Sequence, residues 1–203
     1  MPFIGNQPAK VPLTSADITD GIITSAKIAD GTIVNADINA SAAIASTKLS
    51  GSFGITEADQ WRITANITAD VDPIASNLER VDNTGFGYIG TGMSVASGTW
   101  TFPSTGIYLI RAIGNFNGQA GDNIQIQIKV TTDNSSYTAV AFCDEGEGTG
   151  SAMSAVCEFL FDVTSTANCK VRFQAQSITA GSNIAGATDK NRTSFTFIRL
   201  GDT

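Results

Sequence analysis

The sequence predicts an all-β protein in two parts, an extended N-terminal repeat arm over residues 1–55 and an antiparallel β-sandwich over residues 56–203. Three observations predict this. The 203 residues include 20 glycines and 24 threonines but only 15% charged residues, which favours strands and turns over charged helices. No aromatic residue lies between Phe3 and Phe53, so the aromatic core belongs to the second part. Apolar and polar residues alternate repeatedly in that part.

The arm is predicted from a decapeptide repeat. The run SADITDG at 15–21 is followed by SAKIADG at 25–31 and, more loosely, by NADINAS at 35–41. Aliphatic residues recur along it at steps of five, with one step of six: Leu13, Ile18, Ile23, Ile28, Ile33, Ile38, Ile44 and Leu49. A step of five matches neither helix nor strand periodicity. The backbone must therefore turn between successive aliphatic residues, as the Asp-Gly pairs permit.

Such an arm needs a partner. The entropy lost in ordering about forty residues exceeds what eight apolar side chains return. We therefore expect these eight residues to form the surface through which the arm trimerises and docks onto another protein. The composition leaves one alternative open, a disordered arm rich in alanine, threonine and serine.

The strands of the sandwich are predicted from alternation. The clearest is IQIQIKV at 124–130, with four aliphatic residues on one face and glutamine, glutamine and lysine on the other. Seven further strands are predicted at 61–68, 99–102, 106–115, 137–143, 153–163, 171–176 and 193–200. Turn-rich stretches, such as 133–136 and 180–183, separate them. Eight or more short strands predict a sandwich or jelly roll.

Large side chains at these strand positions form the predicted core: Trp61, Phe102, Tyr108, Ile126, Ile128, Phe159, Phe161, Phe173, Phe195 and Phe197. Apolar residues also occupy the opposite face of two strands. Val156 and Leu160 lie opposite the core side of the first, and Ile198 and Leu200 opposite that of the last. Because one face of a sandwich sheet is normally wet, a second apolar face predicts a subunit interface.

Composition excludes several classes of function. The net charge is -7 and the basic residues do not cluster, so no nucleic acid is expected as a partner. The absence of histidine removes the commonest general base and the Ser-His and Cys-His pairs, so we expect no enzyme, no catalytic residue and no cofactor. The first residues form no signal peptide and no apolar stretch is long enough for a membrane span, so we expect synthesis in a cytoplasm and reduced cysteines.

Two motifs formally suggest ligand sites. The run GFGYIG at 85–90 matches the dinucleotide fingerprint, but no helical pattern follows it to hold a pyrophosphate. The run DEGEG, with Asp144, Glu145 and Glu147, could bind calcium, or could be a solvated acidic loop. Neither motif establishes a site, and we expect no metal.

The sandwich resembles a known family. The run GTWTFPSTGIYLI at 98–110 resembles the early strand pair of the jelly roll shared by tumour necrosis factor and the globular heads of complement. The ending SFTFIRLG at 194–201 is similar to that family's closing strand, with Phe197 where a small glycine is usual. The resemblance covers residues 61–201 and implies a homotrimer packed through one face of the sandwich.

The arm resembles a narrower group. The runs IADGTIVNADI at 28–38 and AAIASTKL at 42–49 resemble repeats in virion structural proteins and tail fibres of phages that infect cyanobacteria. WRIT at 61–64, NLERVD at 77–82 and GYIGTGM at 87–93 resemble the distal knobs of such proteins.

Together the resemblances imply a trimeric protein on the virion surface. Its expected role is that of a capsid decoration, or cement, protein that clamps subunits of the major capsid protein and presents an outward knob for host adhesion. The alternative is a short tail fibre or head fibre whose knob binds a host-surface glycan or protein. Shortness favours decoration, since only about fifty residues remain for an adaptor and shaft. A secreted cytokine-like ligand is disfavoured by the missing signal peptide.

Overall fold

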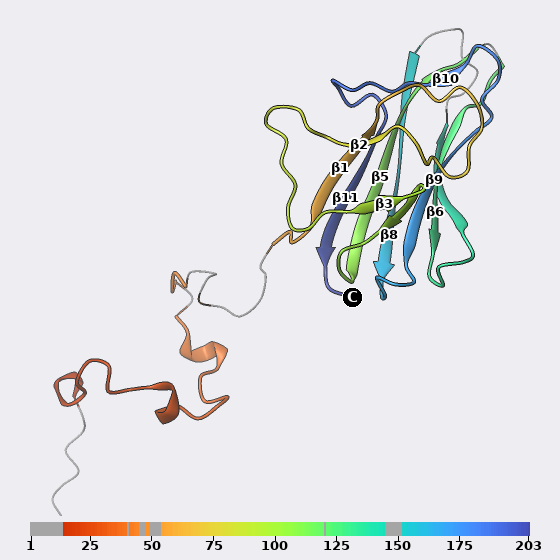
Figure 1. Ribbon diagram of the computed structural model, residues 1–203. Coiled ribbons are helices and arrows are strands. Elements are labelled where there is room, and N and C mark those ends of the chain that lie inside the picture. Colours follow the sequence, from red (N-terminus) through yellow and green to blue (C-terminus); the bar gives the residue numbers. More distant parts are fainter. Residues whose placement is uncertain (1–13, 40, 45–47, 49–53, 120, 145–151) are drawn as a thin grey trace, which may run out of the picture. The chain divides into compact units, whose positions relative to one another are not determined.

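The computed structural model describes residues 14–39, 41–44, 48, 54–119, 121–144 and 152–203 (Figure 1). The chain divides into two compact units, Met1–Ser50 and Gly51–Thr203. The sequence places the same division slightly later, between residues 55 and 56. Among the described residues, no helix has the length and apolar character needed to cross a membrane.

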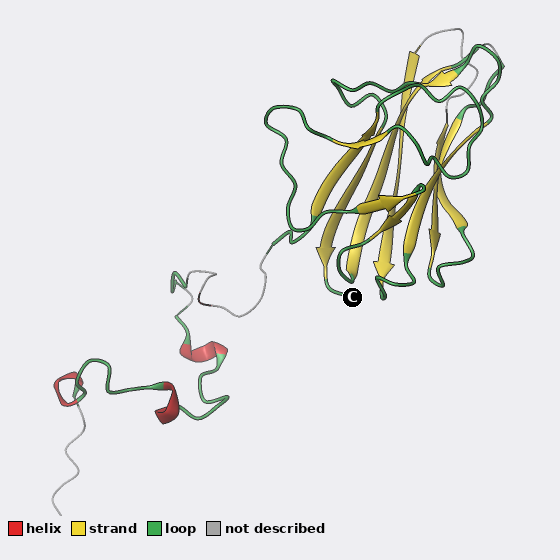
Figure 2. Ribbon diagram, in the orientation of Figure 1, coloured by secondary structure: helices red, strands yellow, loops and turns green. Residues whose placement is uncertain are grey.

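The first unit contains short turns of 3-10 helix joined by irregular chain (Figure 2). Three of them follow one another at intervals of ten residues: η1 (Ser15–Asp17), η2 (Ser25–Lys27) and η3 (Asn35–Asp37). The interval equals that of the sequence repeat, so each copy folds locally in the same way.

The second unit is built from two antiparallel sheets (Figures 1 and 2). In the first, here sheet A, the order is β2-β1-β11-β5-β8, and β10 pairs with the end of β5 beyond β11. Its strands are β1 (Ala58–Ile63), β2 (Leu78–Arg80), β5 (Gly106–Asn117), β8 (Ala152–Val163), β10 (Asn183–Ile184) and β11 (Ser194–Gly201). Strands β5 and β8 pair along their whole length, from Gly106 with Val163 to Asn117 with Ala152.

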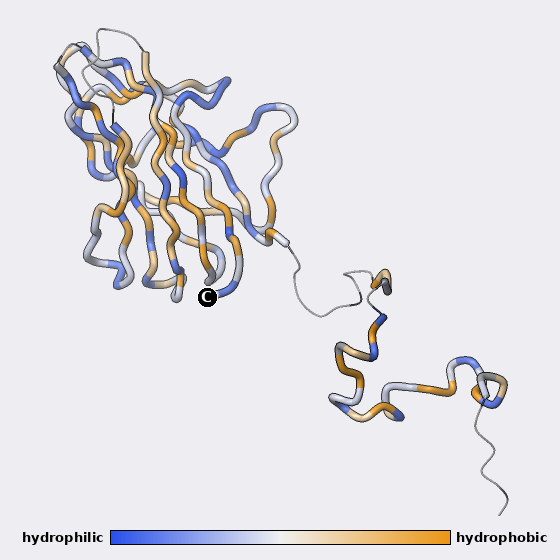
Figure 3. The backbone as a smooth tube through the Cα atoms, turned by 180° about the vertical axis from the view of Figure 1, so that it is seen from behind, coloured by the Kyte–Doolittle hydropathy of each residue, from blue (hydrophilic) through white to orange (hydrophobic). Residues whose placement is uncertain are grey.

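The second sheet, here sheet B, has the order β3-β4-β9-β6-β7. Its strands are β3 (Ser94–Ala96), β4 (Thr99–Thr101), β6 (Gln125–Thr131), β7 (Thr138–Asp144) and β9 (Lys170–Gln176). Hydrophobic and hydrophilic residues alternate along the strands of both sheets (Figure 3). The predicted all-β antiparallel sandwich is thus confirmed.

All eight predicted strands are present, with shifted ends. The largest shift is in β1, predicted to reach residue 68: beyond Ile63 the chain leaves the sheet, and Ile67 forms only one isolated bridge, to Ile184. Three strands were not predicted, β2, β3 and β10. They have three, three and two residues, too few to show alternation, and β10 includes Asn183 of a stretch predicted as a turn.

The core is one cluster of side chains contributed by both sheets. Trp100 lies within it, fully buried, with its ring centroid 5.1 Å from that of Trp61 and 5.0 Å from that of Phe197. Eight of the ten residues proposed from sequence as the core are buried, whereas Trp61 and Phe159 are partly buried and pack against the cluster. Trp100 was absent from that set, although it contacts four aromatic rings.

Candidate functional site

The repeat gives the arm a recurring local structure. The carboxylate of Asp17 accepts hydrogen bonds from the backbone N–H and hydroxyl of Thr14, at 2.8 and 2.7 Å. Asp37 accepts one from the backbone N–H of Val34 at 2.9 Å, in the equivalent position two copies later. The middle copy has Lys27 there and no side-chain cap. Gly21 and Gly31 follow the 3-10 turns, and both have a φ of +77°. Glycine adopts this left-handed conformation without strain, which explains its presence at these two positions.

The aliphatic residues of the arm face solvent. Six of the eight proposed as the docking surface lie among the described residues, and all six are exposed, by 38 to 55%: Ile18, Ile23, Ile28, Ile33, Ile38 and Ile44. We call these six residues the arm ridge. Leu13 and Leu49 lie outside the described residues. A row of exposed isoleucines is unfavourable in water, so the ridge is a candidate association surface.

A second apolar surface lies on the outward side of sheet A. Leu109 of β5 pairs directly with Leu160 of β8 on one side and with Ile198 of β11 on the other, which makes an apolar row across three strands. Val156 and Leu200 extend it along β8 and β11. Leu160 is 58% exposed, Val156 55% and Leu200 49%. These five residues form what we call the sheet-A face.

One ion pair crosses the middle of this face. Arg111 follows Leu109 on the same side of β5 and donates through Nε to Glu158 of β8 at 2.9 Å. About half of each side chain remains exposed. An exposed pair of this kind adds little stability, about 0.2–1 kcal/mol, so the apolar residues around it dominate the energetics of the face.

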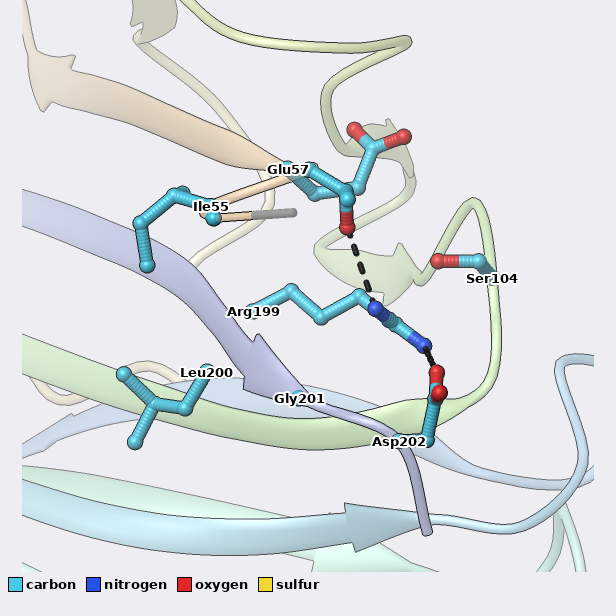
Figure 4. A pocket seen from close by; sticks show the side chains of 9 residues that line it. Ile55, Glu57, Ser104, Arg199, Leu200, Gly201 and Asp202 are labelled. Atoms are coloured by element: carbon cyan, nitrogen blue, oxygen red, sulfur yellow. Dashed lines mark hydrogen bonds and ion pairs between the residues drawn. The ribbon is translucent and has the colours of Figure 1, made fainter. Parts of the chain in front are cut away.

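A hollow of about 680 Å³ opens at the end of the sandwich where β11 finishes (Figure 4). Arg199 crosses it, with its Nε donating to the carbonyl oxygen of Thr105 at 2.7 Å and its Nη1 to the hydroxyl of Thr56 at 3.1 Å. Its third guanidinium nitrogen pairs with Asp202, and its backbone N–H donates to the carbonyl oxygen of Glu57 at 2.9 Å. Arg199 thus joins the first residues of the sandwich, Thr56 and Glu57, to its last strand and to Asp202. We assign no ligand to the hollow.

Sequence reasoning missed a buried charge network beside β1. Asp59, 4% exposed, accepts hydrogen bonds from the indole N–H of Trp61 at 2.8 Å and from the backbone N–H of Met93 at 2.8 Å. Arg80 completes it, with Nη2 at 3.0 Å from Asp59 and 2.7 Å from the carbonyl oxygen of Met93. The alternation of β1 gives no signal for this network, because Arg80 comes from a strand too short to predict and Met93 from the loop before β3.

Two of the three buried cysteines are in contact. Cys143 of β7 and Cys157 of β8 interact through their side chains, and the hydrogen bond with Cys143, together with burial, raises the pKa of the Cys157 thiol. The hydrogen bond from Cys157 lowers the pKa of Cys143, whereas the charge of Asp144 acts in the opposite direction.

The two ligand motifs give no site in the described structure. Residues 85–90 form a loop between β2 and β3, with a turn closed by Phe86 and an isolated bridge at Ile89, and no helix follows. In the acidic run, Glu145 and Glu147 lie outside the described residues. Among the residues that are described, no three cysteine or acidic side chains are grouped so that they could hold a metal ion.

No protein-family model matches the chain, and no curated protein matches its sequence. Solved structures resemble it in fold. The crystal structure of murine APRIL at pH 5.0 is 11% identical, with a TM-score of 0.54 over 71% of this chain and 98% of that one. The structure of Eiger TNF from S. frugiperda is 12% identical, with a TM-score of 0.52 over 72% of this chain and 93% of that one.

At such identities the likeness shows the fold alone, and the second unit therefore has a jelly roll of the tumour necrosis factor type. A further structure, PRD1 vertex protein P5, is 17% identical over 73% of this chain and 100% of that one. Its TM-score is 0.47, too low to establish a common fold.

Proposed function

We propose that the chain is a non-enzymatic structural protein of a phage particle, a homotrimer whose arm docks onto another virion protein while its jelly roll faces outward as a knob. The observation that carries the proposal is the pair of apolar surfaces, the arm ridge and the sheet-A face, both open to solvent in a single chain. Exposed apolar surface of this extent is typical of association sites.

The sheet-A face supports the trimer. Burial of apolar area is worth about 25 cal/mol per Å², so covering the row of Leu109, Leu160 and Ile198 in every copy favours association. A closed cyclic trimer covers the face in all three copies at once, which an open chain of contacts does not. The resemblance to tumour necrosis factor implies the same arrangement.

The trimer is tested by sedimentation and native mass spectrometry of the full chain. We expect a species of three times the 21.1 kDa of one chain. Leu160→Asp, which places a carboxylate in the centre of the face, is expected to leave a folded monomer. The matched control is Ile89→Asp, an isoleucine 48% exposed on the loop between β2 and β3. A monomeric parent chain, or trimers of Leu160→Asp, would refute the arrangement.

The role on the particle is tested by copy number, measured by gel densitometry of purified particles against the major capsid protein. We propose decoration of the capsid, for which hundreds of copies per particle are expected. A few to some tens of copies would assign the chain to a tail or head fibre and make receptor binding its main role. Absence from purified particles would refute both roles.

A further inference from the structure

The outward side of sheet B differs in chemistry from the sheet-A face. Four glutamines project from it in two adjacent cross-strand pairs, Gln125 with Gln176 and Gln127 with Gln174, on the neighbouring strands β6 and β9. All four are half-buried. Phe142 of the edge strand β7 pairs with Gln127 on the other side and is 60% exposed. We call these five residues the amide platform.

Hydrogen bonds fix the orientation of the four amides. Gln174 donates to Gln176 at 3.1 Å, and Gln176 donates to Gln125 at 2.8 Å. Gln127 also donates to the oxygen of Gln125, at 3.3 Å. The series starts from Lys129, whose ammonium group donates to the oxygen of Gln174 at 3.1 Å. Each amide therefore has a defined direction, and little side-chain entropy remains to be lost when a ligand binds.

The series leaves hydrogen-bonding groups available. An amide side chain offers two N–H donors and one oxygen with two acceptor positions. Within the described part of the chain, the NH₂ group of Gln125 and the oxygen of Gln127 have no partner. The platform thus presents donors and acceptors together, a pattern complementary to hydroxyl groups, which both donate and accept.

Charged residues lie on both sides of the platform, and Asp144 of β7 pairs in register with Gln125. Lys129 pairs with Asp72 at 2.6 Å, and the guanidinium carbon of Arg172 lies 3.9 Å from the ring centroid of Tyr137. The platform itself carries no charge, and the whole chain has a net charge of -7. A polyanion would meet the carboxylate of Asp144 at one edge of the platform, a lysine that is already paired with Asp72, and a protein of net negative charge.

Phe142 supplies the apolar half of the surface. An aromatic ring exposed at the rim of a polar patch gives a flat face against which the C–H groups of a sugar ring can pack. A second copy of the chain would be a poor occupant, because burying the amides against another protein surface costs their hydration. We propose that the amide platform binds a neutral polysaccharide, with hydroxyl groups on the glutamines and one sugar ring on Phe142.

This inference rests on the proposed function, since a knob displayed on a particle is where a glycan site has a use. The test uses the full chain on an array of neutral hexose oligomers, namely glucans, mannans and galactans, beside sulfated and uronic-acid oligomers. Binding to a neutral oligomer is expected. Phe142→Ala and the double variant Gln127→Ala with Gln174→Ala are each expected to weaken it at least tenfold in titration calorimetry.

Two matched controls lie away from the platform. Gln119→Ala removes an exposed glutamine of a loop, and Tyr88→Ala removes an aromatic residue that is 49% exposed between β2 and β3. Both are expected to bind as the parent chain does, and all variants to remain folded. Binding confined to anionic oligomers, no binding to any neutral oligomer, or equal loss in the controls would overturn the inference.

Sedimentation of the same samples separates this inference from the proposed function. If the chain forms trimers but binds no neutral oligomer, only the proposed glycan site on the amide platform is refuted. A chain that binds a neutral oligomer but stays monomeric would refute the trimer alone, and its absence from particles would refute the proposed virion role.

Discussion

At the scale of single residues, Asp59 is a demanding position. Its carboxylate is almost fully withdrawn from water and is compensated by Arg80 and by N–H groups of Trp61 and Met93. A buried charge is tolerated only when it is paired and hydrogen-bonded in this way. The network also fixes the chain before β3, because Met93 contributes both its N–H and its carbonyl oxygen.

Replacing this carboxylate should therefore be costly. Asp59→Ala leaves the indole N–H of Trp61 and the N–H of Met93 unpaired and Arg80 without its counter-ion. We expect the free energy of unfolding to fall by about 3 kcal/mol, measured by urea denaturation. Asp189→Ala, which removes an exposed partner of Lys190, is the control and should change it by less than about 0.5 kcal/mol.

A second residue predicts how stability depends on pH. Hydrogen bonds from Ser182 and Thr179, and one from the N–H of Gln119, hold the pKa of Asp122 below its usual value. The stabilisation is thus complete above the usual aspartate pKa of about 4 and is lost as pH falls through the lowered value. Asp122→Asn should unfold at a lower temperature than the parent at pH 7, and the difference should shrink between pH 5 and pH 2. A constant difference would contradict the assignment.

At the scale of elements, what could be predicted depended on length. Strand β6 alternates over seven residues, and its sequence alone assigned each side chain to a face. Strands β2, β3 and β10 are too short to carry a period, so pairing with a neighbouring strand has to create them. The outward apolar side chains of β8 and β11 were predicted by the same alternation. The amide platform was not, because it depends on the register between β6 and β9.

The arm is an element of another kind, with recurring turns but a ridge that nothing in the single chain covers. Ile28 and Ile33 lie in its middle, around the Gly31 turn. Changing both to Asp is expected to abolish attachment to the particle, because carboxylates cannot be buried in an apolar contact without a partner. The measurement is co-sedimentation with particles that lack the chain, and Ile55→Asp, an exposed isoleucine beyond the ridge, is the control. Attachment that survives the double change would refute the docking role of the arm.

At the scale of the whole molecule, the two units differ in where their apolar residues make contacts. Every residue of the core cluster lies between Ile63 and Phe197, within the second unit. The jelly roll was predictable as a fold class, because eight strands and one aromatic core leave few alternatives. The partner of the arm was not predictable, because a solvent-facing row of isoleucines specifies burial but not the surface that provides it.

The sandwich should therefore fold without the arm. A chain beginning at residue 54 retains the whole core cluster and the Asp59 network. We expect its thermal unfolding midpoint to lie within a few degrees of that of the full chain, measured by circular dichroism. A shift of more than about 10 °C, or loss of the cooperative transition, would show that the arm contributes to the fold.

The joining of the first and last residues of the sandwich by Arg199 has a practical consequence. Residues 54–57 and Asp202 line the same hollow, whereas the loop at 177–182 lies at the opposite end of β5 (Figures 1 and 4). A peptide fused after Thr203 would therefore emerge beside the start of the sandwich. A foreign epitope fused there would therefore be displayed at the end of the knob opposite the loop at 177–182.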